Sequence, residues 1–383
     1  MDEKTLFDQF HEALDVEPRP GAYERMRYAF TSHPDARARA SAPGHQPVAR
    51  NLTWLMGAAA VLLAIAIVAG LMVVRLMNSH PLPVVPGPRS QLCVSGPTGP
   101  SDRFATVHGY ITYSDRSEIW AVDPDRPANR ISIGPSNGRT PIAWSRDGSR
   151  LLLRTAGTNN FNGDLCVMNA DGSQTRLTSD GLTSEGSFSR NAATVVFARQ
   201  DDGLYLVDAK GGTPMQIAKK YGSWNLESPA WSPDDSRIAY LVYYEFDPKG
   251  PSYQIWTVRP DGTDPRQVVD LGSCERGGCT GGLVWSPDGS MLAFDSARGP
   301  APTYPTSSLR PLAIYVVHAD GSELHRINDD GSWPSWSPDG SRIAFTRGPD
   351  LFTMASDGRD VRQVDGVAVA PPYGWAWNPV AGR

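Results

Sequence analysis

Residues with the chemistry of catalysis are few in this chain and are spread along its length. The segment Gly134–Gly138, GPSNG, matches the G-x-S-x-G pattern, in which a strand–turn–helix presents a nucleophilic serine. The repeat described below places this segment in a loop between two units, so we interpret the match as coincidental. His318 and His325 are predicted to lie on adjoining strands, and no set of histidines and cysteines has the spacing of a zinc site. The sequence therefore predicts no catalytic residue, no metal and no cofactor.

Four cysteines offer a second kind of chemistry, the formation of disulfides. Cys274 and Cys279 close a short loop, CERGGC, that would suit a disulfide. Cys166 stands where the other repeats carry an aromatic residue, and two interpretations are open: a small buried thiol, or a disulfide with Cys93 that would pin the preceding segment to the repeats. All four cysteines follow a long apolar segment described below. Because disulfides belong outside the cytosol, this placement favours an extracytoplasmic C-terminal part.

The elements that must position any site come from a repeat, of which PSWSPDGSRIAFTR, residues 334–347, is the clearest copy. It contains a strand with an aromatic anchor, a Ser-Pro-Asp-Gly turn and a second strand. In this turn, proline presets the backbone for a type I turn and glycine takes the left-handed conformation that follows. The anchors recur at intervals of 41 to 54 residues, at Trp144, Phe188, Trp231, Trp285, Trp336 and Trp377.

Each unit also contains a second phrase, such as AIYVVHADGS or QIWTVRPDGT, followed by a short closing strand. Four strands per unit and a period in the forties are typical of a β-propeller, so six anchors predict an all-β, six-bladed propeller. The first unit lacks an anchor strand, and the last unit consists of the anchor strand GWAWNPV alone. Together they are predicted to form one blade, which closes the ring and leaves no free sheet edge.

The composition agrees with a turn-rich β fold and excludes one class of partner. The chain has 383 residues, with 37 glycines and 33 prolines, which suits β structure with many turns better than helices. Its formal net charge is −5 at pH 7. This balance provides no basic footprint for nucleic acid, so no nucleic-acid partner is predicted.

A segment without charged residues, Leu52–Val74, precedes the repeats. As a helix it would be roughly 35 Å long, enough to cross a hydrocarbon core of about 30 Å. The segment starts about fifty residues into the chain and is too long for the apolar part of a cleaved signal peptide. We therefore predict an uncleaved signal anchor in the cell membrane, a single-pass transmembrane helix with its N-terminus in the cytoplasm and the propeller outside.

The remaining segments complete a five-part organisation. Two short amphipathic stretches, EKTLFDQFHEAL and RPGAYERMRYAF, predict small N-terminal helices that cannot form a core of any size. They can pack on each other, lie on the membrane or bind a partner. The predicted parts are a helical cytoplasmic segment (1–32), a disordered linker (33–51), the transmembrane helix (52–76), a proline-rich stalk (77–105) and the propeller (106–383).

The phrase WSPDGSRIAF followed by IYVVHADGS resembles the propeller repeat of the TolB family, which is close to the WD-repeat-like units of dipeptidyl-peptidase propellers. The resemblance covers residues 105–383 and implies a six-bladed TolB-like fold. TolB proteins also have an N-terminal α/β domain connected with lipoprotein partners of the envelope, and this chain has no counterpart to it. A membrane anchor and a cytosolic tail stand in its place, so the resemblance implies the fold and not the TolB role.

The predicted strand order divides the connections between two faces of the propeller. The Ser-Pro-Asp-Gly and Ala-Asp-Gly-Ser turns fall on one face, the turn face, and are nearly identical between blades. The connections on the opposite face, the loop face, are long and irregular, as in loops that carry function on a rigid scaffold. We predict a ligand-binding surface on the loop face, although its aromatic residues could instead fill gaps between blades. The candidates are Tyr221, Trp224, Tyr243, Tyr244, Glu245, Asp247, Arg276, Arg298, Tyr304 and Trp333.

These features favour a membrane-anchored, extracytoplasmic binding or sensing module of the cell envelope. The propeller would bind a protein, peptide or glycan, and residues 1–50 would relay occupancy to a cytosolic protein partner. Two alternatives stay open, a propeller enzyme of the hydrolase, lactonase or lyase type and a passive envelope scaffold. Because no catalytic constellation is visible, the sequence favours a protein that is not an enzyme. A deep channel lined with carboxylates would favour the enzyme, and a broad aromatic surface would favour binding.

Overall fold

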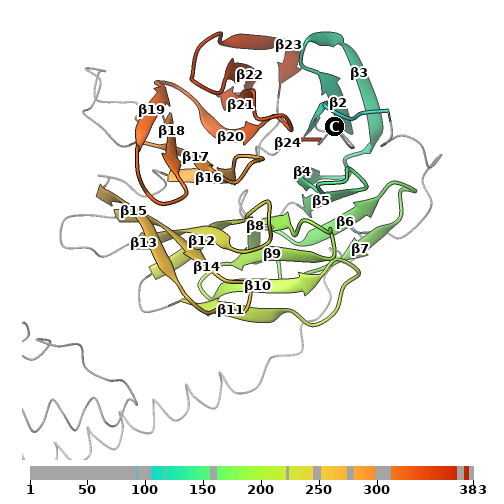
Figure 1. Ribbon diagram of the computed structural model, residues 1–383. Coiled ribbons are helices and arrows are strands. Elements are labelled where there is room, and N and C mark those ends of the chain that lie inside the picture. Colours follow the sequence, from blue (N-terminus) through green and yellow to red (C-terminus); the bar gives the residue numbers. More distant parts are fainter. Residues whose placement is uncertain are drawn as a thin grey trace, which may run out of the picture. The chain divides into compact units, whose positions relative to one another are not determined.

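Strands and tight turns alternate through the described part of the chain, and the strands pair into six four-stranded antiparallel sheets. The computed structural model describes residues 93, 104 and 106–378, except for 116, 156–161, 221–223, 245–251, 274–279, 298–311 and 369–374. Figure 1 shows the sheets as blades in a ring around a central axis, with the anchor strands innermost. The predicted all-β, six-bladed propeller with four-stranded blades is therefore confirmed.

The blades are numbered in chain order, and the strands of each run from the axis outward. Blade 1 contains β24 (Trp375–Trp377), β1 (Ile111–Ser114), β2 (Glu118–Asp123) and β3 (Arg126–Pro135). Blade 2 contains β4 (Arg139–Trp144), β5 (Arg150–Thr155), β6 (Leu165–Asn169) and β7 (Gln174–Arg176). Blade 3 contains β8 (Thr183–Phe188), β9 (Thr194–Arg199), β10 (Gly203–Asp208) and β11 (Met215–Lys219).

The second half of the ring follows the same order. Blade 4 contains β12 (Trp224–Trp231), β13 (Ile238–Tyr244), β14 (Ser252–Val258) and β15 (Arg266–Ser273). Blade 5 contains β16 (Thr280–Trp285), β17 (Met291–Ser296), β18 (Ala313–His318) and β19 (His325–Asn328). Blade 6 contains β20 (Ser332–Trp336), β21 (Arg342–Arg347), β22 (Asp350–Ala355) and β23 (Arg362–Ala368).

The predicted segments that precede the propeller lie almost entirely outside the described residues. This holds for the cytoplasmic segment, the linker, the signal anchor at 52–76 and the stalk except for Cys93 and Phe104. Within the described ranges, no helix has the length and apolar character needed to span a membrane. The chain divides into two compact units, Met1–Val85 and Pro86–Arg383, and the propeller belongs to the second.

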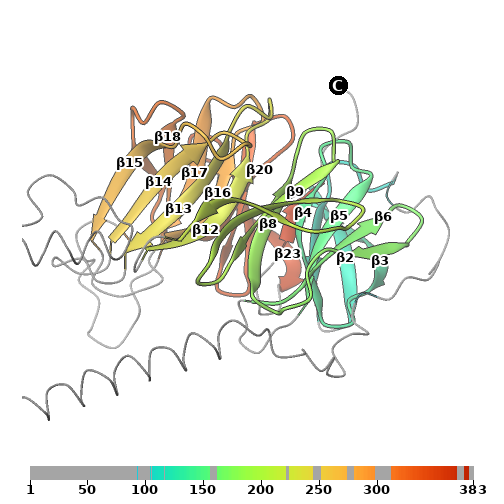
Figure 2. The same cartoon turned by 90° about the horizontal axis from the view of Figure 1, so that it is seen from below.

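Each blade buries both of its faces against its neighbours, because alternate residues of a strand point to opposite sides of the sheet. In β21, Ile343 and Phe345 pack toward blade 5, whereas Ala344 packs toward blade 1. Six clusters of buried apolar residues result, one at each contact between neighbouring blades. Figure 2 shows the neighbouring blades from the side of the ring. Burial on both faces explains why the second strands are apolar along most of their length instead of alternating with polar residues.

The same hydrogen bonds build the Ser-Pro-Asp-Gly turns of different blades, as residues 337–342 illustrate. The Asp339 carboxylate accepts hydrogen bonds from the Ser337 hydroxyl (2.6 Å) and the Ser341 backbone N–H (3.1 Å). The Gly340 N–H donates to the Ser337 carbonyl (2.9 Å), and the Gly340 φ of +71° is the predicted left-handed conformation. The bond from Ser337 is the main reason why the pKa of Asp339 lies below its ordinary value. An ionised aspartate in each such turn is therefore part of the scaffold.

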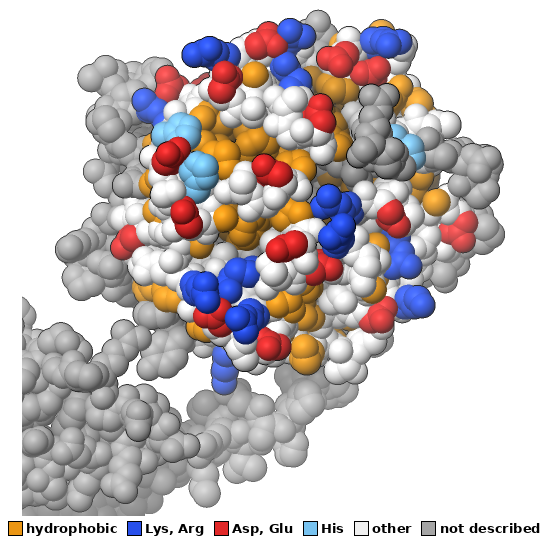
Figure 3. All heavy atoms as spheres, viewed as in Figure 1, with side chains coloured by type: hydrophobic (Ala, Val, Ile, Leu, Met, Phe, Trp, Pro, Cys, Tyr) orange, Lys and Arg blue, Asp and Glu red, His pale blue; other side chains and the backbone are white. Residues whose placement is uncertain are grey.

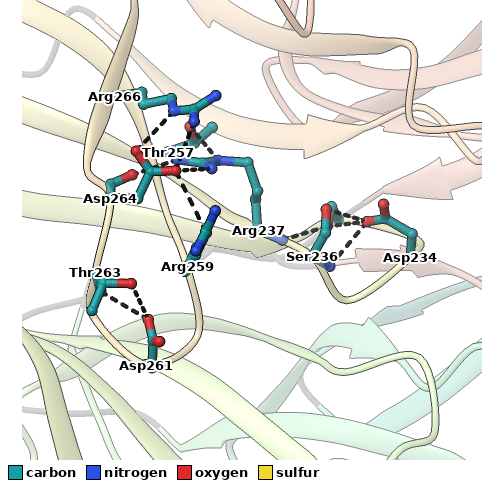
Figure 4. Close-up of polar contacts among 10 residues, drawn as sticks. Asp234, Ser236, Arg237, Thr257, Arg259, Asp261, Thr263, Asp264 and Arg266 are labelled. Carbon is teal, nitrogen blue, oxygen red and sulfur yellow. Dashed lines mark hydrogen bonds and ion pairs between the residues drawn. The ribbon is translucent and has the colours of Figure 1, made fainter.

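A second set of contacts fastens the turn of blade 4 to the outer hairpin of the same blade (Figure 4). The Arg237 guanidinium donates to Thr257 Oγ1 (2.9 Å) and to the Asp264 carboxylate (3.0 Å). Arg266 donates to the same carboxylate (2.9 Å). Blade 6 repeats the arrangement with Arg342, Thr353, Asp360 and Arg362. These arginines of the turn face therefore have structural partners.

Strand β24 closes the ring as the sequence predicts. It pairs antiparallel with β1, and Ile111 faces Trp377 in the register. Backbone bonds continue the closure at the turn face, where the Gly109 N–H donates to the Asn378 carbonyl (3.1 Å). The Trp377 indole N–H also donates to the Gly109 carbonyl (2.8 Å). Residues more than 260 positions apart thus share one blade, and β1 is paired on both of its sides, by β24 and by β2.

A disulfide joins the segment before the first blade to the ring. Cys93 and Cys166 are bonded, with their Cα atoms 6.1 Å apart. Of the two interpretations of Cys166, a buried thiol or a disulfide with Cys93, the structure shows the disulfide. Cys166 is fully buried in β6. Phe104 is also buried and packs edge-on against Trp144, with 4.8 Å between ring centroids. Cys274 and Cys279, the other predicted pair, lie outside the described residues.

Candidate functional site: the central channel

Four innermost strands, β8, β12, β16 and β20, contain a β-bulge at the same place. The residues three positions before the anchors, at these bulges, are Glu185, Ser228, Gly282 and Trp333. A bulge turns side chains out of the regular alternation of a strand. Ser228 and Trp333 have φ angles of 49° and 56°. This left-handed conformation costs roughly 1–3 kcal/mol for a residue other than glycine, and a strained bulky residue is a marker of functional sites.

Gly282 shows how tightly the bulges of blades 5 and 6 approach each other. A Cβ atom added at Gly282 would lie 2.9 Å from the Trp333 Cα and 2.9 Å from the Pro334 Cδ. The Gly282 φ of 58° is a conformation that glycine adopts without strain. Only glycine therefore fits beside the Trp333 bulge, and the innermost strands of these blades are held close together at this level of the channel.

The innermost strands of all six blades enclose a central channel of about 560 Å³. Its wall is mostly apolar and aromatic, and its charged side chains are few. The anchor aromatics line it together with prolines of the turn face, and the remaining charged and aromatic lining residues include Arg146, Arg154, Glu185, Arg190 and Trp333. A concave, largely apolar cavity with a few placed polar groups is the usual form of a ligand-binding site.

A group of charged side chains lies toward the loop-face end of this channel. Arg154 and Asp295 occupy the same position in the second strands of blades 2 and 5, and their exposed fractions are 5% and 1%. The second strands run from the turn face to the loop face, so this position is near the loop face. Glu185 and Glu227 precede their anchors on the innermost strands and lie toward the same end. Arg154 and Glu185 line the channel, and the charge of Glu185 acts on both Glu227 and Asp295.

Arg154 and Asp295 both form hydrogen bonds with the innermost strand of the next blade. The Arg154 guanidinium donates to the Ser184 carbonyl (2.6 Å), within the innermost strand of the next blade. Asp295 Oδ2 accepts a hydrogen bond from the Trp333 backbone N–H (2.6 Å), which ties the carboxylate to the Trp333 bulge. Asp295 Oδ1 is buried and accepts no hydrogen bond of normal geometry among the described residues, although the Gly281 N–H is near enough to lower the pKa of the carboxyl group. A carboxylate with an unsatisfied buried oxygen is costly, so Asp295 favours a proton or a polar ligand.

Burial and mutual repulsion raise the pKa values of the three carboxyl groups. Burial raises the pKa of Glu185, against a hydrogen bond from Ser228 and the charge of Arg154. Burial and the charge of Glu185 raise the pKa of Glu227 to about 7. Burial is also the main reason why the pKa of Asp295 rises to about 7, with the charge of Glu185 adding to it and the Trp333 N–H opposing it. Near neutral pH Glu227 and Asp295 therefore each populate both protonation states.

The arrangement does not form a metal centre. No group of three or more histidine, cysteine or acidic residues in the described part of the chain is placed to hold a metal ion. His318 and His325 end β18 and begin β19, on the adjoining strands that the sequence predicts. His318 Nε2 lies 3.2 Å from Glu323 Oε2 on the turn face, away from the channel. The segment GPSNG ends β3 and forms the turn before β4, between two blades, so it is not a nucleophile elbow.

The structure places only some of the predicted ligand-binding residues. Trp333 lines the channel beside the carboxyl cluster. Tyr243 stacks on Tyr253 (4.8 Å between ring centroids) at the contact of blades 4 and 5, and the Tyr244 hydroxyl donates to Gln254 Oε1 (3.1 Å). The backbone of Trp224 begins β12. The others lie outside the described residues: Tyr221, Glu245, Asp247, Arg276, Arg298 and Tyr304.

The sequence analysis missed the charged residues of the channel. Their signal is a departure from the repeat: Arg154 and Asp295 stand where every other blade has a neutral residue in its second strand. Those residues are Ser114, Ala198, Leu241 and Thr346. An alignment of the repeats position by position would have shown two charges in a strand that is otherwise buried. Such charges are rare without a partner or a function.

Comparison with known proteins supports the fold. No family model matches the chain. The uncharacterized protein Atu1656 of Agrobacterium fabrum is 29% identical over 229 residues, which are 57% of this chain and 69% of that protein. A putative TolB from Agrobacterium tumefaciens is similar in structure, with a TM-score of 0.51 and 21% identity, over 70% of this chain and 93% of that one. TolB from Acinetobacter baumannii gives a TM-score of 0.54 and 18% identity, over 71% and 67%. The chain therefore has a TolB-like propeller fold, and at this identity the likeness extends to the fold alone.

Proposed function

We propose that the chain is a membrane-anchored, extracytoplasmic propeller that binds a protein, peptide or glycan at the loop-face end of its central channel. The observation that supports this most is the charged cluster of Arg154, Glu185, Glu227 and Asp295 inside the ring. Taking a charge out of water costs several kcal/mol even after relaxation of the protein. The fold does not require this cost, because the equivalent positions of the other blades are neutral. Groups kept at such a cost in a cavity are candidates for ligand contacts.

The proposed location rests on two features at different places in the chain. The uncharged segment Leu52–Val74 is long enough to act as a signal anchor. The Cys93–Cys166 disulfide is of a kind that persists in oxidising compartments and is rare in the cytosol. Both features favour a propeller outside the membrane. We further propose that residues 1–50, on the cytoplasmic side, contact a cytosolic protein and report whether the propeller is occupied.

Ligand capture by the full-length chain in detergent tests the binding proposal. The tagged chain would be incubated with extracts of the cell envelope, alongside the variant Glu185→Gln/Glu227→Gln and the control Glu323→Gln. Glu323 is an exposed acid of the turn face. The wild type and the control should retain the same ligand, and the channel variant should retain at least about tenfold less, since a lost charged contact costs about 1.5–3 kcal/mol. Equal retention by all three chains would contradict the proposal.

A propeller enzyme is the second candidate, because carboxyl groups at a channel favour an enzyme and two of these groups have pKa values of about 7. The binding module is preferred because, among the described residues that line the channel, Glu185 is the one acid and the rest are mostly apolar and aromatic. A carboxyl group in this range can give or take a proton during a reaction at neutral pH. The fate of the captured ligand separates the candidates. A ligand recovered unchanged after long incubation supports the binding module. A ligand that is cleaved by the wild type but not by Glu227→Gln or Asp295→Asn supports the enzyme. A passive scaffold would retain its partner equally well in the channel variants.

A further inference from the structure

The opposite mouth of the channel, on the turn face, also departs from the repeat. The second residue of the Ser-Pro-Asp-Gly turn is a proline in blades 4, 5 and 6, at Pro233, Pro287 and Pro338. Blades 2 and 3 have Arg146 and Arg190 instead. The turn itself is unchanged, because the Gly148 N–H donates to the Ser145 carbonyl (2.9 Å) as in the other blades. The turn geometry therefore does not explain two arginines in neighbouring blades.

Both arginines lie at the mouth of the channel. They line the channel itself and an adjoining hollow of about 390 Å³ on the turn face. Arg146 Nη1 lies 3.4 Å from the Pro233 carbonyl of blade 4, so its side chain passes the turn of blade 3. The backbone N–H of Arg190 donates to Asp235 in the same blade-4 turn (2.7 Å). Both arginines are therefore anchored to the same turn of blade 4, Arg146 through its guanidinium and Arg190 through its backbone, and both line the hollow beside it.

These arginines also lack the partners that other arginines of the turn face have. Within the described part of the chain, neither guanidinium forms an ion pair. The Arg146 guanidinium makes one long hydrogen bond there, to the Pro233 carbonyl. Arg237, by contrast, is held by Asp264 (Figure 4). The nearby acids of the mouth, Asp234 and Asp288, accept bonds within their own turns. Two unpaired guanidinium groups in one hollow form a binding site for carboxylate.

The apolar wall beside the arginines indicates which kind of carboxylate-bearing molecule would fit this mouth of the channel. Trp285, Pro233 and Pro287 line both cavities at this mouth. Figure 3, which views the turn face, shows Lys and Arg side chains beside apolar surface near its middle. A small anion would leave this apolar wall unused. A peptide segment with an apolar side chain next to carboxylates would contact both the wall and the guanidinium groups, as the anchors of protein interfaces do.

We propose that the turn-face mouth of the channel binds an acidic segment of a protein partner through Arg146 and Arg190. Its carboxylates contact the two guanidinium groups, and an adjacent apolar side chain enters the channel between Trp285 and the prolines. This site is at the opposite end from the carboxyl cluster of Glu185 and Asp295, so it does not depend on the function proposed for that cluster.

Two probe peptides test the proposal with the full-length chain in detergent. The acidic probe is acetyl-Gly-Asp-Phe-Asp-Gly-amide, and the neutral probe has asparagine in place of both aspartates. Binding is followed by calorimetry and by the fluorescence of the channel tryptophans. The acidic probe should bind at least about tenfold more tightly than the neutral probe, and the difference should shrink as salt is added. No binding of the acidic probe, or equal binding of both, overturns the proposal.

Matched variants locate the site. Arg146→Gln/Arg190→Gln should remove the preference for the acidic probe, and Arg126→Gln/Arg259→Gln, which removes two exposed arginines elsewhere, should keep it. If the glutamine variant folds poorly, Arg146→Met/Arg190→Met, which keeps an unbranched apolar side chain and the Arg190 backbone N–H, should also remove the preference. Glu185→Gln should leave it unchanged. Equal losses in both double variants overturn the site, and displacement of the probe by citrate at the same carboxylate concentration overturns the choice of a protein segment.

Discussion

Carboxyl groups at the two ends of the propeller axis are in opposite states. On the turn face, Asp339 and its equivalents are surrounded by hydrogen-bond donors, and their pKa values lie below the ordinary value. At the loop-face end of the channel, burial and the charge of Glu185 raise the pKa values of the half-buried Glu227 and the buried Asp295 to about 7. The low values come from bonds that recur in blade after blade, whereas the high values come from residues present once. Repetition therefore identifies the scaffold, and departure from it identifies the site.

Two tryptophans of one strand give the largest expected contrast. Trp336 is the anchor of blade 6, and its exposed fraction is 9%. Trp336→Ala should lower the free energy of unfolding by about 3–5 kcal/mol because it removes a buried aromatic side chain. Trp333 lies three residues earlier in a left-handed conformation that glycine adopts freely, so Trp333→Gly should leave stability within about 1 kcal/mol. Denaturant unfolding of both variants measures the two changes in the free energy of unfolding. A larger loss of stability in Trp333→Gly than in Trp336→Ala would contradict the assignment of Trp336 to the scaffold and Trp333 to the site.

The effect of Asp295 on the stability of the fold should depend on pH. Its pKa in the folded protein is about 7, above the ordinary value of 3.8 for an aspartate. Between about pH 4 and pH 7, the folded state therefore holds a proton that the unfolded state has lost. The contribution of this carboxyl group to stability is complete below about pH 4 and disappears as the pH rises to about 7. Asp295→Asn keeps the side chain neutral. The variant should be more stable than the wild type at pH 8 by on the order of 2 kcal/mol, and nearly equal to it at pH 4.

Thermal unfolding between pH 4 and pH 8 checks this prediction. Its control is Asp339→Asn, which changes a turn aspartate of opposite behaviour. A difference between Asp295→Asn and the wild type that does not grow with pH would show that Asp295 is not protonated in the folded state.

Asp339 itself should have a smaller effect of the opposite sign. Its pKa is lowered in the fold, so its contribution to stability is complete above about pH 4 and is lost below that value, as the pH falls through the lower pKa of the folded state. Asp339→Ala removes the bonds from Ser337 and Ser341 and should cost about 1 kcal/mol at pH 7, since exposed charge-assisted bonds are weak. Asp339→Asn should cost less, because Asn191 accepts the same bonds in blade 3. Urea unfolding at pH 7 compares the three chains, and an equal loss in both variants would argue against the role of these bonds.

The scaffold could largely be predicted from the sequence, whereas the loop-face site could not, and the reason is physical. The Ser-Pro-Asp-Gly turns and the aromatic anchors are local signals, so they gave the blade number, the strand order and the closure by β24. The loop-face site depends instead on which side chains meet across the ring. Arg154 and Glu185 belong to neighbouring blades and Asp295 to a distant one, and no local pattern predicts that they approach. Trp333 was predicted because it is one of the aromatic residues in the connections assigned to the loop face.

The smallest expected effect tests whether the channel carboxyl groups act as one cluster. Glu185 is a source of the raised pKa of both Glu227 and Asp295. Glu185→Gln removes a negative charge, so the pKa of each should fall, by about half a unit to one unit. Carbon-13 NMR of labelled side-chain carboxyl groups would follow both titrations. Unchanged titration of Glu227 and Asp295 would mean that the three groups do not interact.

Photo-crosslinking in cells tests most directly whether the loop-face end of the channel is the binding site. A photoreactive phenylalanine derivative would replace Trp333 in the channel or, as a control, Met215, which is 56% exposed on an outer strand of blade 3. The channel position should form a discrete adduct that Glu185→Gln/Glu227→Gln reduces by at least about tenfold, and the outer position should form none. Adducts of equal yield at both positions, or an adduct at Trp333 that does not respond to the carboxyl variants, would contradict the account.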